Sequence, residues 1–400
     1  MATPAALARR LDYRGPALFS YGFRPFFLAG SAWAALAVLL WLPQFFGEIV
    51  LPTALTPMDW HVHEMIFGYV AAVVAGFLLT AIPNWTGRLP VCGAPLASLV
   101  VLWLAGRVAI LVSQTIGAAA AAAIDLSFLA VLALVALREI VAGSNWRNLR
   151  VLGVLGILLL GNVVFHIEVL SSGVAEYGPR IGLAAVIALI MVIGGRIVPS
   201  FTHNWLVRSN PGRLPVQFSR FDAFSLVSAA LALLAWVAAP HHRATGLLLM
   251  LAGAIHVLRL ARWAGDRTVA DRLVLVLHVA YAFIPIGFAL TGAAVLWPAA
   301  VPASAGIHAW ATGAIGLMTL AVMTRASLGH TGQPLQASTA TQAIYLLILI
   351  AAFARIAAAF TATVPLLHIA GIAWLAAFGG FVVVFGPRLA LRPPAWAGRR

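Results

Sequence analysis

Two histidines separated by one residue, and a glutamate directly after them, form the most chemically distinctive segment of the sequence. The chain has 11 histidines, and the segment reads Asp59-Trp60-His61-Val62-His63-Glu64. Residues two apart on an α-helix point about 200° apart. One metal takes both histidines only if the segment is unwound, whereas a helix would direct them to two neighbouring centres. In a helix, Glu64 and Met65 would share the face of His61.

The remaining histidines fall near the ends of apolar segments, in two tiers. An outer tier holds His166, His308 and His368 with the pair above, and an inner tier holds His203, His256, His278 and His330. A lone histidine in a helix bundle more often hydrogen-bonds a neighbouring helix, and we keep that interpretation for His166, His203, His256 and His368. The adjacent His241 and His242 are interpreted as a solvated pair. For His61, His63, His278 and His308, ligation of haem iron or copper is an equal alternative.

Ionisable residues also lie inside the apolar segments, among them Arg107, Asp125, Arg355, Glu168 and Glu64. Arg107 and Asp125 lie at similar distances from the turn near residue 115, so we predict an intramembrane ion pair with a structural role. Arg355, Glu168 and Glu64 have no obvious local partner. They are therefore better candidates for function.

The composition predicts that these side chains are carried by membrane-spanning helices. The chain is 62% hydrophobic and 9% charged, against about 25% charged for a soluble domain. A helix that crosses the bilayer needs about 20 apolar residues. We therefore predict an all-α polytopic membrane protein with twelve spans: 26–46, 59–82, 94–113, 117–140, 149–171, 178–198, 219–239, 244–264, 270–296, 304–325, 338–361 and 365–386. The single cysteine, Cys92, excludes a site built from several thiolates.

The arginines indicate the orientation of these spans. The sequence has no lysine, so its 25 positive residues are all arginine. If the N-terminus and every second loop are cytoplasmic, 21 arginines face the cytoplasm and two, Arg180 and Arg243, face outward. This bias predicts an inner-membrane protein with cytoplasmic N- and C-termini. It also explains the net charge of +14 without a nucleic-acid partner, because the positive residues form no basic face.

We predict one integral-membrane domain over 1–400, with the inner loop at 199–218 dividing two six-helix halves. No convincing sequence repeat relates these halves. The first 25 residues carry arginine and lack the features of a cleaved signal, so the first helix is expected to remain as an anchor.

Several segments together resemble one known family. WHVHEMIFGYVAAVVAGFLLTAIPNWTGR at 60–88 is similar to the hallmark segment of the NnrS family. SYGFRPFFL at 20–28, GGRIVPSFTHNWL at 194–206, LHVAYAFIPIG at 277–287 and IGLMTLAVMTRASLGHTG at 315–332 also resemble that family. These segments are spread over nearly the whole chain.

The resemblance implies a bacterial membrane protein that contains haem, expected to be b-type, and copper, linked to denitrification and nitrosative stress. The family's histidine motifs fall on His61, His63, His278, His308 and His330, whereas His203 is a weaker match. We hypothesise that His308 ligates haem together with one of His61 and His63, that the other binds copper, and that Glu64 orients a ligand or passes protons. His278 and His330 would form an inner group.

The ligand that this resemblance implies is nitric oxide, and bilayer lipid is the other expected partner. The sequence leaves open whether NO is reduced, as by an oxidoreductase, bound or sensed, and it does not identify an electron donor. Two other functions remain alternatives. One is a twelve-helix secondary transporter with a His/Glu proton relay. The other is a distant relative of respiratory oxidases, although the chain lacks a His-Pro-Glu-Val-Tyr-like copper segment.

Overall fold

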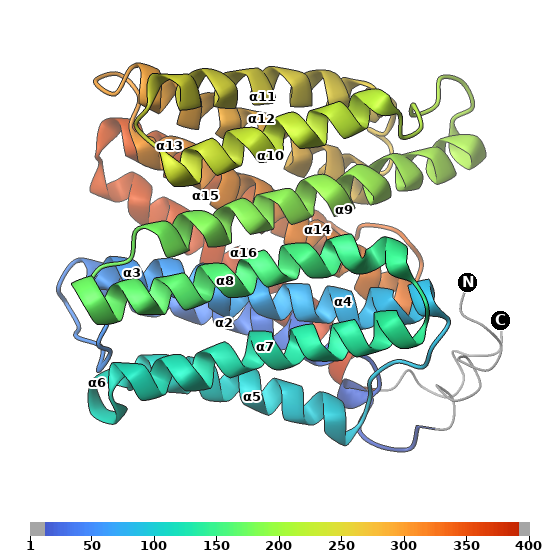
Figure 1. Ribbon diagram of the computed structural model, residues 1–400. Helices are drawn as coiled ribbons and strands as arrows, with labels where there is room; N and C mark the ends of the chain where they lie inside the picture. Colours follow the sequence, from blue (N-terminus) through green and yellow to red (C-terminus); the bar gives the residue numbers. More distant parts are fainter. Residues whose placement is uncertain (1–12, 392–400) are drawn as a thin grey trace. The chain divides into compact units, whose positions relative to one another are not determined.

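The computed structural model describes residues 13–391, and the secondary structure of this part is helical (Figure 1). Twelve of its helical segments are long and apolar enough to cross a membrane, which confirms the predicted number. They are α2 (Phe23–Phe45), the continuous α3 (Pro57–His63), η2 (Glu64–Val70) and α4 (Ala71–Thr86), α5 (Ala94–Leu111), α7 (Ala118–Ala142), η3 (Trp146–Asn148) with α8 (Leu149–Ser172), α9 (Tyr177–Ser209), α10 (Arg220–Ala238), α11 (Arg243–Ala261), α12 (Arg272–Leu296), the continuous α13 (Ala303–His308), η5 (Ala309–Gly316) and α14 (Leu317–His330), α15 (Thr339–Thr361) and α16 (Val364–Ala390). The chain is therefore a multi-pass membrane protein.

One helix is much longer than the sequence predicts. α9 continues through Pro199 to Ser209, so the inner loop predicted at 199–218 is wrong at its start, and His203 lies on a helix. Proline removes one backbone hydrogen bond, but transmembrane helices tolerate it because neighbouring groups satisfy the freed carbonyl. Arg9, Arg10, Arg392, Arg399 and Arg400, which contribute to the predicted orientation, lie outside the described residues.

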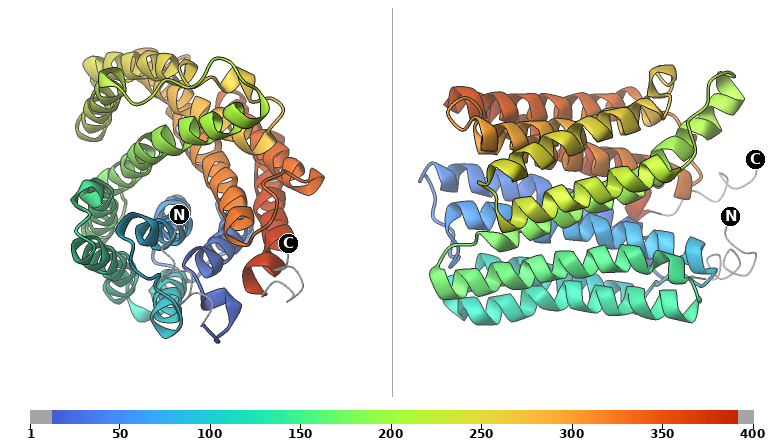
Figure 2. Two further views of the ribbon diagram at one scale, coloured as in Figure 1. Left: turned by 90° about the vertical axis from the view of Figure 1, so that its right-hand side faces the viewer. Right: turned by 45° about the horizontal axis from the view of Figure 1, so that its top comes forward.

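The chain separates into two compact units. Unit 1 comprises the chain up to Gly182, Ala326–Gln333 and the part from Phe378 onward; unit 2 comprises Leu183–Arg325 and Pro334–Ala377. In unit 1, α2 packs on α4, and α7 packs against both α5 and α8. The helices of residues 94–172, coloured cyan to green, lie side by side in both views of Figure 2. In unit 2, α11 packs between α10 and α12, and α12 packs on α13 and η5.

The structure contains a repeat that the sequence analysis missed. Each unit has a transmembrane helix that changes to a π-helical segment directly after a histidine: η2 follows His63, and η5 follows His308. His63 and His308 are 245 residues apart, and Gly87 and Gly332, which follow the two helices and have positive φ, have the same separation. The next helices, α5 and α15, also begin 245 residues apart. The repeat is carried by spacing and helix geometry rather than by overall similarity.

Candidate metal centre

The candidate centre lies in unit 1, where α3, α5, α7 and α8 each contribute a buried polar side chain. α3 begins at a defined point because Thr56 accepts a hydrogen bond from the backbone N–H of Asp59 (3.1 Å) and Pro57 occupies the first helical position. This start places His63 at the end of α3, directly before the π-helical segment η2. Short π-helical segments inside α-helices are common at functional sites.

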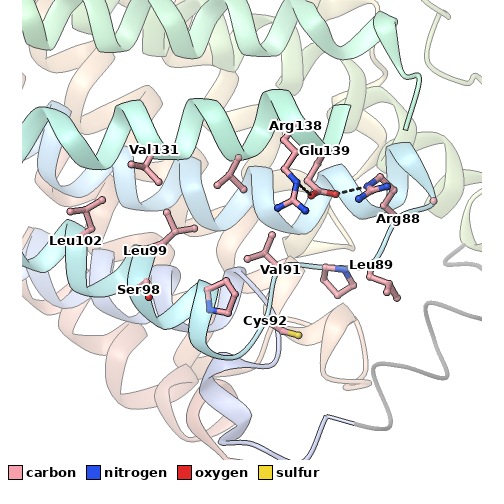
Figure 3. Close-up of a pocket in the computed structure, with 14 residues that line it drawn as sticks. Arg88, Leu89, Val91, Cys92, Ser98, Leu99, Leu102, Val131, Arg138 and Glu139 are labelled. Carbon is pink, nitrogen blue, oxygen red and sulfur yellow. Dashed lines mark hydrogen bonds and ion pairs between the residues drawn. The ribbon is translucent and has the colours of Figure 1, made fainter. Parts of the chain in front are cut away.

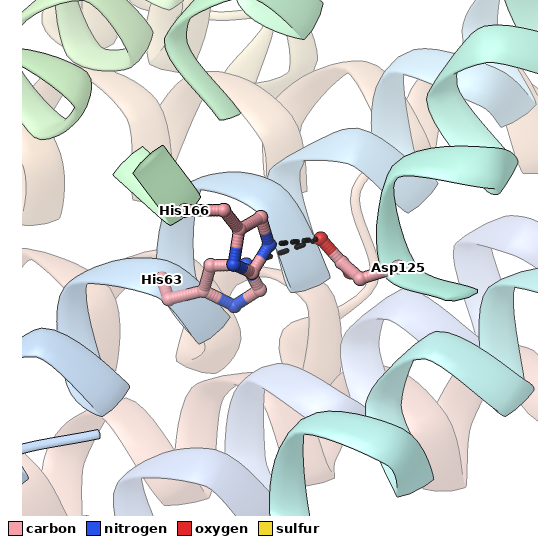
Figure 4. A group of neighbouring side chains, drawn as sticks. All are labelled: His63, Asp125 and His166. Carbon is pink, nitrogen blue, oxygen red and sulfur yellow. Dashed lines mark hydrogen bonds and ion pairs between the residues drawn. The ribbon is translucent and has the colours of Figure 1, made fainter. Parts of the chain in front are cut away.

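His63, Asp125 and His166 form a buried group whose candidate ligand atoms all lie within 4.8 Å of one another. His63 Nε2 lies 3.2 Å and His166 Nε2 3.1 Å from Asp125 Oδ2. Figure 4 shows the two imidazole rings turned toward this carboxylate from the same side. The side chains come from three helices, α3, α7 and α8, and each residue is at most 5% exposed. Two imidazoles and a carboxylate are a donor set that could bind a metal ion.

Arg107 connects this group to a second carboxylate. It donates from Nη2 to Asp125 and from Nη1 to both oxygens of Glu64 (2.6 Å each). The predicted pairing of Arg107 with Asp125 is therefore confirmed. The expectation that Glu64 lacks a partner is wrong, because Glu64 also accepts from Trp33 Nε1 at 2.6 Å. Asn162 Nδ2 donates to Asp125 Oδ2 at 2.7 Å.

Hydrogen-bond geometry assigns the protons on His63. Its Nδ1 faces Glu64 Oε1 at 3.0 Å, and its Nε2 faces Asp125. When Glu64 and Asp125 are both ionised, their oxygens can only accept, so each ring nitrogen that faces them carries a proton. The ring is then an imidazolium, and Arg107 and His63 together balance the charges of Glu64 and Asp125. Charge balance of this kind is what allows four ionisable groups to remain buried in a membrane protein.

A glycine in η2 makes this close arrangement feasible. A Cβ atom at Gly68 would lie 2.7 Å from Glu64 Oε2, 2.8 Å from Arg107 Nη1 and 3.0 Å from Trp33 Nε1. Any side chain at this position would displace the Glu64 carboxylate or the two groups that hold it, Arg107 and Trp33. The carbonyl of Gly68 accepts a hydrogen bond from Trp103 Nε1 (2.9 Å). Since a π-helical turn shifts the backbone hydrogen-bond pattern, this side-chain donor supports the segment.

His61 points away from the group, as the helical spacing predicts. Its ring stacks on Trp41 with the centroids 4.0 Å apart, whereas His63 contacts Phe165 and His166. The prediction that Glu64 shares the face of His61 is wrong. Glu64 begins the π-helical segment, and its carboxylate reaches the same side as His63, where Arg107 and Trp33 hold it.

Comparison with known proteins identifies the family of the chain. The sequence matches the family model described as NnrS protein over residues 17–392. The chain belongs to the NnrS family. A comparison with curated protein sequences found no match. The matched region contains every residue of the buried group and all of the histidines that the sequence analysis selected.

The other selected histidines of this NnrS-family chain lie in different surroundings. His330 is in unit 1, where its ring packs against Tyr21 and Phe23. His278 and His308 are in unit 2. His278 Nε2 lies 2.7 Å from Thr202 Oγ1, and its buried Nδ1 has no hydrogen-bond partner. His308 Nδ1 lies 2.7 Å from the carbonyl of Ser304, one turn earlier on its helix.

The sequence analysis interpreted His166 as a histidine that only hydrogen-bonds a neighbouring helix. The structure places it in the candidate centre. It does hydrogen-bond a neighbouring helix, as expected, but its partner Asp125 is shared with His63. Asn162 precedes His166 by four residues, so both lie on one face of α8. Two polar residues on one face of an otherwise apolar helix were the feature of the sequence that could have indicated His166 as a site residue.

Glu168 and Arg355, the other two residues for which the sequence showed no obvious local partner, lie in different surroundings. Glu168 accepts backbone hydrogen bonds from Glu176, Tyr177 and Gly178 (2.8–3.0 Å), so it closes the connection between α8 and α9. Within residues 13–391, Arg355 has no hydrogen bond or ion pair. It follows Ala351 and Ala352 on the buried face of α15 by one helical turn.

Proposed function

We propose that this NnrS-family protein binds copper at His63, Asp125 and His166. The observation that carries the proposal is the buried two-histidine, one-carboxylate group. Ligands 2.0–2.2 Å from a common metal are ~3.3–3.5 Å apart in a tetrahedral site. The contacts of 3.1 and 3.2 Å in the group are close to that spacing. Imidazole nitrogen suits copper, and a metal at this point would take the place of the protons between the rings and Asp125.

The surrounding residues are suited to hold such a ligand set in place. Asn162 and Arg107 fix the Asp125 carboxylate from two sides. Glu64 accepts a hydrogen bond from His63 Nδ1 and thereby orients the ring so that Nε2 points at the centre. Carboxylate–histidine pairs of this type fix the orientation of metal-binding imidazoles. Glu64 therefore holds a proton on His63 Nδ1 as a positioning residue.

We further propose that the protein binds haem, as its family resemblance implies, and that His308 would be a residue that holds it. The Nδ1–H of His308 donates to the Ser304 carbonyl, which leaves Nε2 as the lone-pair nitrogen of the neutral ring. This is the tautomer in which metal-binding histidines are usually held. When bound, haem iron supplies a centre that binds nitric oxide and exchanges an electron. Because His63 is assigned to copper here, the predicted sharing of the haem falls to His61; this sharing and the roles of His278 and His330 stay predictions.

The function supported best is that of an inner-membrane metalloprotein of nitric-oxide metabolism or nitrosative-stress resistance. NO is small and uncharged and dissolves in lipid, so it reaches a buried centre without a polar channel. Phe67 and Phe165 pack against the His63 ring and exclude water from that side. Nitric oxide is accordingly the proposed ligand, and reduction of NO is the proposed reaction if a second metal and an electron donor complete the site.

A second candidate function is a twelve-helix transporter with a proton relay. The observation in its favour is the charge-balanced chain of hydrogen bonds from Glu64 through His63 and Asp125 to His166. A proton added to or removed from this chain leaves one uncompensated charge, which is the property that couples proton binding to movement in transporters. In that case the histidines would carry protons and no metal.

The deciding experiment is metal analysis and spectroscopy of the full chain purified in mild detergent. We expect copper and a reduced-minus-oxidised haem spectrum that changes with NO. His63→Ala and His166→Ala are expected to lose copper and to retain haem, and His308→Ala to lose the haem signal. His241→Ala, in an exposed loop between α10 and α11, is the matched control. A metal-free, colourless protein after supply of copper and haem, with saturable binding of a solute, would favour the transporter.

A further inference from the structure

A pocket of about 760 Å³ lies in unit 1, between α5, α7 and the connection between α4 and α5 (Figure 3). It is separate from the candidate metal centre, and none of the histidines lines it. Its lining combines apolar side chains of both helices with charged residues at one end: Gly87, Arg88, Leu89, Pro90, Val91, Cys92, Pro95, Ser98, Leu99, Leu102, Val131, Val135, Arg138 and Glu139.

The apolar part of the pocket lies beside exposed aliphatic side chains of two membrane-spanning helices. Leu99 and Leu102 on α5 face Val131 and Val135 on α7. Beside them on the two helices, Val101 and Leu134 are 65% and 64% exposed. Exposed aliphatic side chains on membrane-spanning helices contact lipid tails. A chain that leaves this pocket between α5 and α7 therefore stays in an apolar environment.

The other end of the pocket is positively charged. Arg88 Nε lies 2.6 Å from Glu139, so this pair is close to neutral. Arg138 lies 3.9 Å from the same carboxylate, and its side chain is 78% exposed. Two arginines and one glutamate leave a net charge of +1 at the rim. Figure 3 shows these three residues at one end of the pocket and Leu102 and Val131 at the other.

We propose that this pocket binds an anionic phospholipid of the surrounding bilayer. The phosphate pairs with Arg138, beside the Arg88–Glu139 pair, and the first part of an acyl chain lies among Leu99, Leu102, Val131 and Val135. The pocket matches both parts of a phospholipid. Its cationic rim suits the phosphate, and its apolar part suits the acyl chain. Basic pockets between transmembrane helices on the cytoplasmic side recognise anionic headgroups in this way.

Native mass spectrometry of the full chain with phosphatidylglycerol or phosphatidylcholine tests the proposal. We expect wild type to retain phosphatidylglycerol preferentially. Arg138→Gln should weaken its retention about fivefold, the ratio expected for one arginine near a membrane surface. Val135→Trp, which fills the apolar part without changing charge, should also weaken it. Arg150→Gln removes another exposed arginine that lies outside the pocket and should leave retention unchanged.

Cys92 supplies a second measurement on the unmodified protein, because it is the only cysteine and lines the pocket. Phosphatidylglycerol should slow its alkylation by a maleimide more than phosphatidylcholine does. Equal effects of the two lipids on retention and on alkylation would overturn the proposal. An Arg150→Gln loss as large as that of Arg138→Gln would also overturn it, because the attraction would then be a property of net charge alone.

Discussion

Arg107 is the residue on which the buried charges of unit 1 depend. One guanidinium pairs with Glu64 and Asp125, and its side chain is 2% exposed. Removing one partner of a buried ion pair costs more than the pair contributes, because the remaining charge is left without compensation. The opposite situation occurs at Arg355, which has no ion-pair partner within the described residues.

This contrast predicts opposite effects of the same substitution. Arg107→Leu should destabilise the protein by about 3–5 kcal/mol, since two carboxylates would then face only His63. Arg355→Leu should leave stability unchanged or raise it, because it removes a charge that costs energy in the membrane. The fraction of protein that remains monodisperse after heating in detergent measures both effects. Equal losses in the two variants would contradict the proposed charge balance.

Asn162 is predicted to act on the metal site without being a ligand. Its amide fixes Asp125 Oδ2, and loss of such a supporting hydrogen bond typically weakens metal binding 10–100-fold. Asn162→Leu should therefore lower copper affinity by a factor of about 10–100 while His63, Asp125 and His166 remain. Copper titration of the purified protein measures the change. An unchanged affinity would mean that Asp125 is not a ligand.

At the residue scale, the sequence predicted contacts between neighbouring helices better than contacts among several helices. The pairing of Arg107 and Asp125 followed from their similar distances to one turn, because a short turn makes the two helices antiparallel neighbours. Glu64 and His166 come from α3–η2 and α8, whose positions beside that pair depend on tertiary packing. Nothing local in the sequence specifies which buried donor reaches the Glu64 carboxylate.

At the scale of the element, the π-helical segments determine where the histidines point. A π-helical turn adds a residue to an α-helix and thereby changes the direction of all side chains before it relative to those after it. η2 lies between His63 and the part of α4 that packs on α2 and α7. Its geometry therefore sets the position of His63 relative to Asp125.

Deleting Met65 tests this role. The deletion removes one residue from η2, which restores α-helical spacing and rotates His63 and Glu64 by ~100° relative to α4. We expect loss of copper with little change in helix content by circular dichroism. Met65→Ala keeps the length of the segment and should retain copper. A deletion variant that still binds copper would show that α3 adjusts its position independently of α4.

The repeat was not found from the sequence because most residues differ between its two copies. The two copies share histidine and glycine positions at a separation of 245 residues, but apolar residues exchange freely on membrane helices. Glu64 of the first copy corresponds to Ala309 of the second. The number of helices was predictable because a span requires a minimum apolar length, whereas the end of α9 was not, because Pro199 ends helices in water and is tolerated in a membrane.

At the scale of the whole molecule, the orientation in the membrane rests on the arginines alone. The positive-inside rule assigns the connection between α4 and α5 to the cytoplasm and the connection between α10 and α11 to the opposite side. Cys92 lies in the first of these connections and His241 in the second. Because the chain has no other cysteine, the two sides can be labelled separately.

A membrane-impermeant maleimide should label wild-type Cys92 in inverted membrane vesicles and not in cells with an intact inner membrane. In the double variant Cys92→Ser, His241→Cys, the pattern should reverse. Burial raises the pKa of the Cys92 thiol, and the thiolate is the reactive form. Labelling of Cys92 should therefore be slower than that of an exposed thiol at neutral pH and should accelerate as the pH rises. Labelling of both positions from the same side would require an even number of spans between them, and the predicted placement of both termini in the cytoplasm would be wrong.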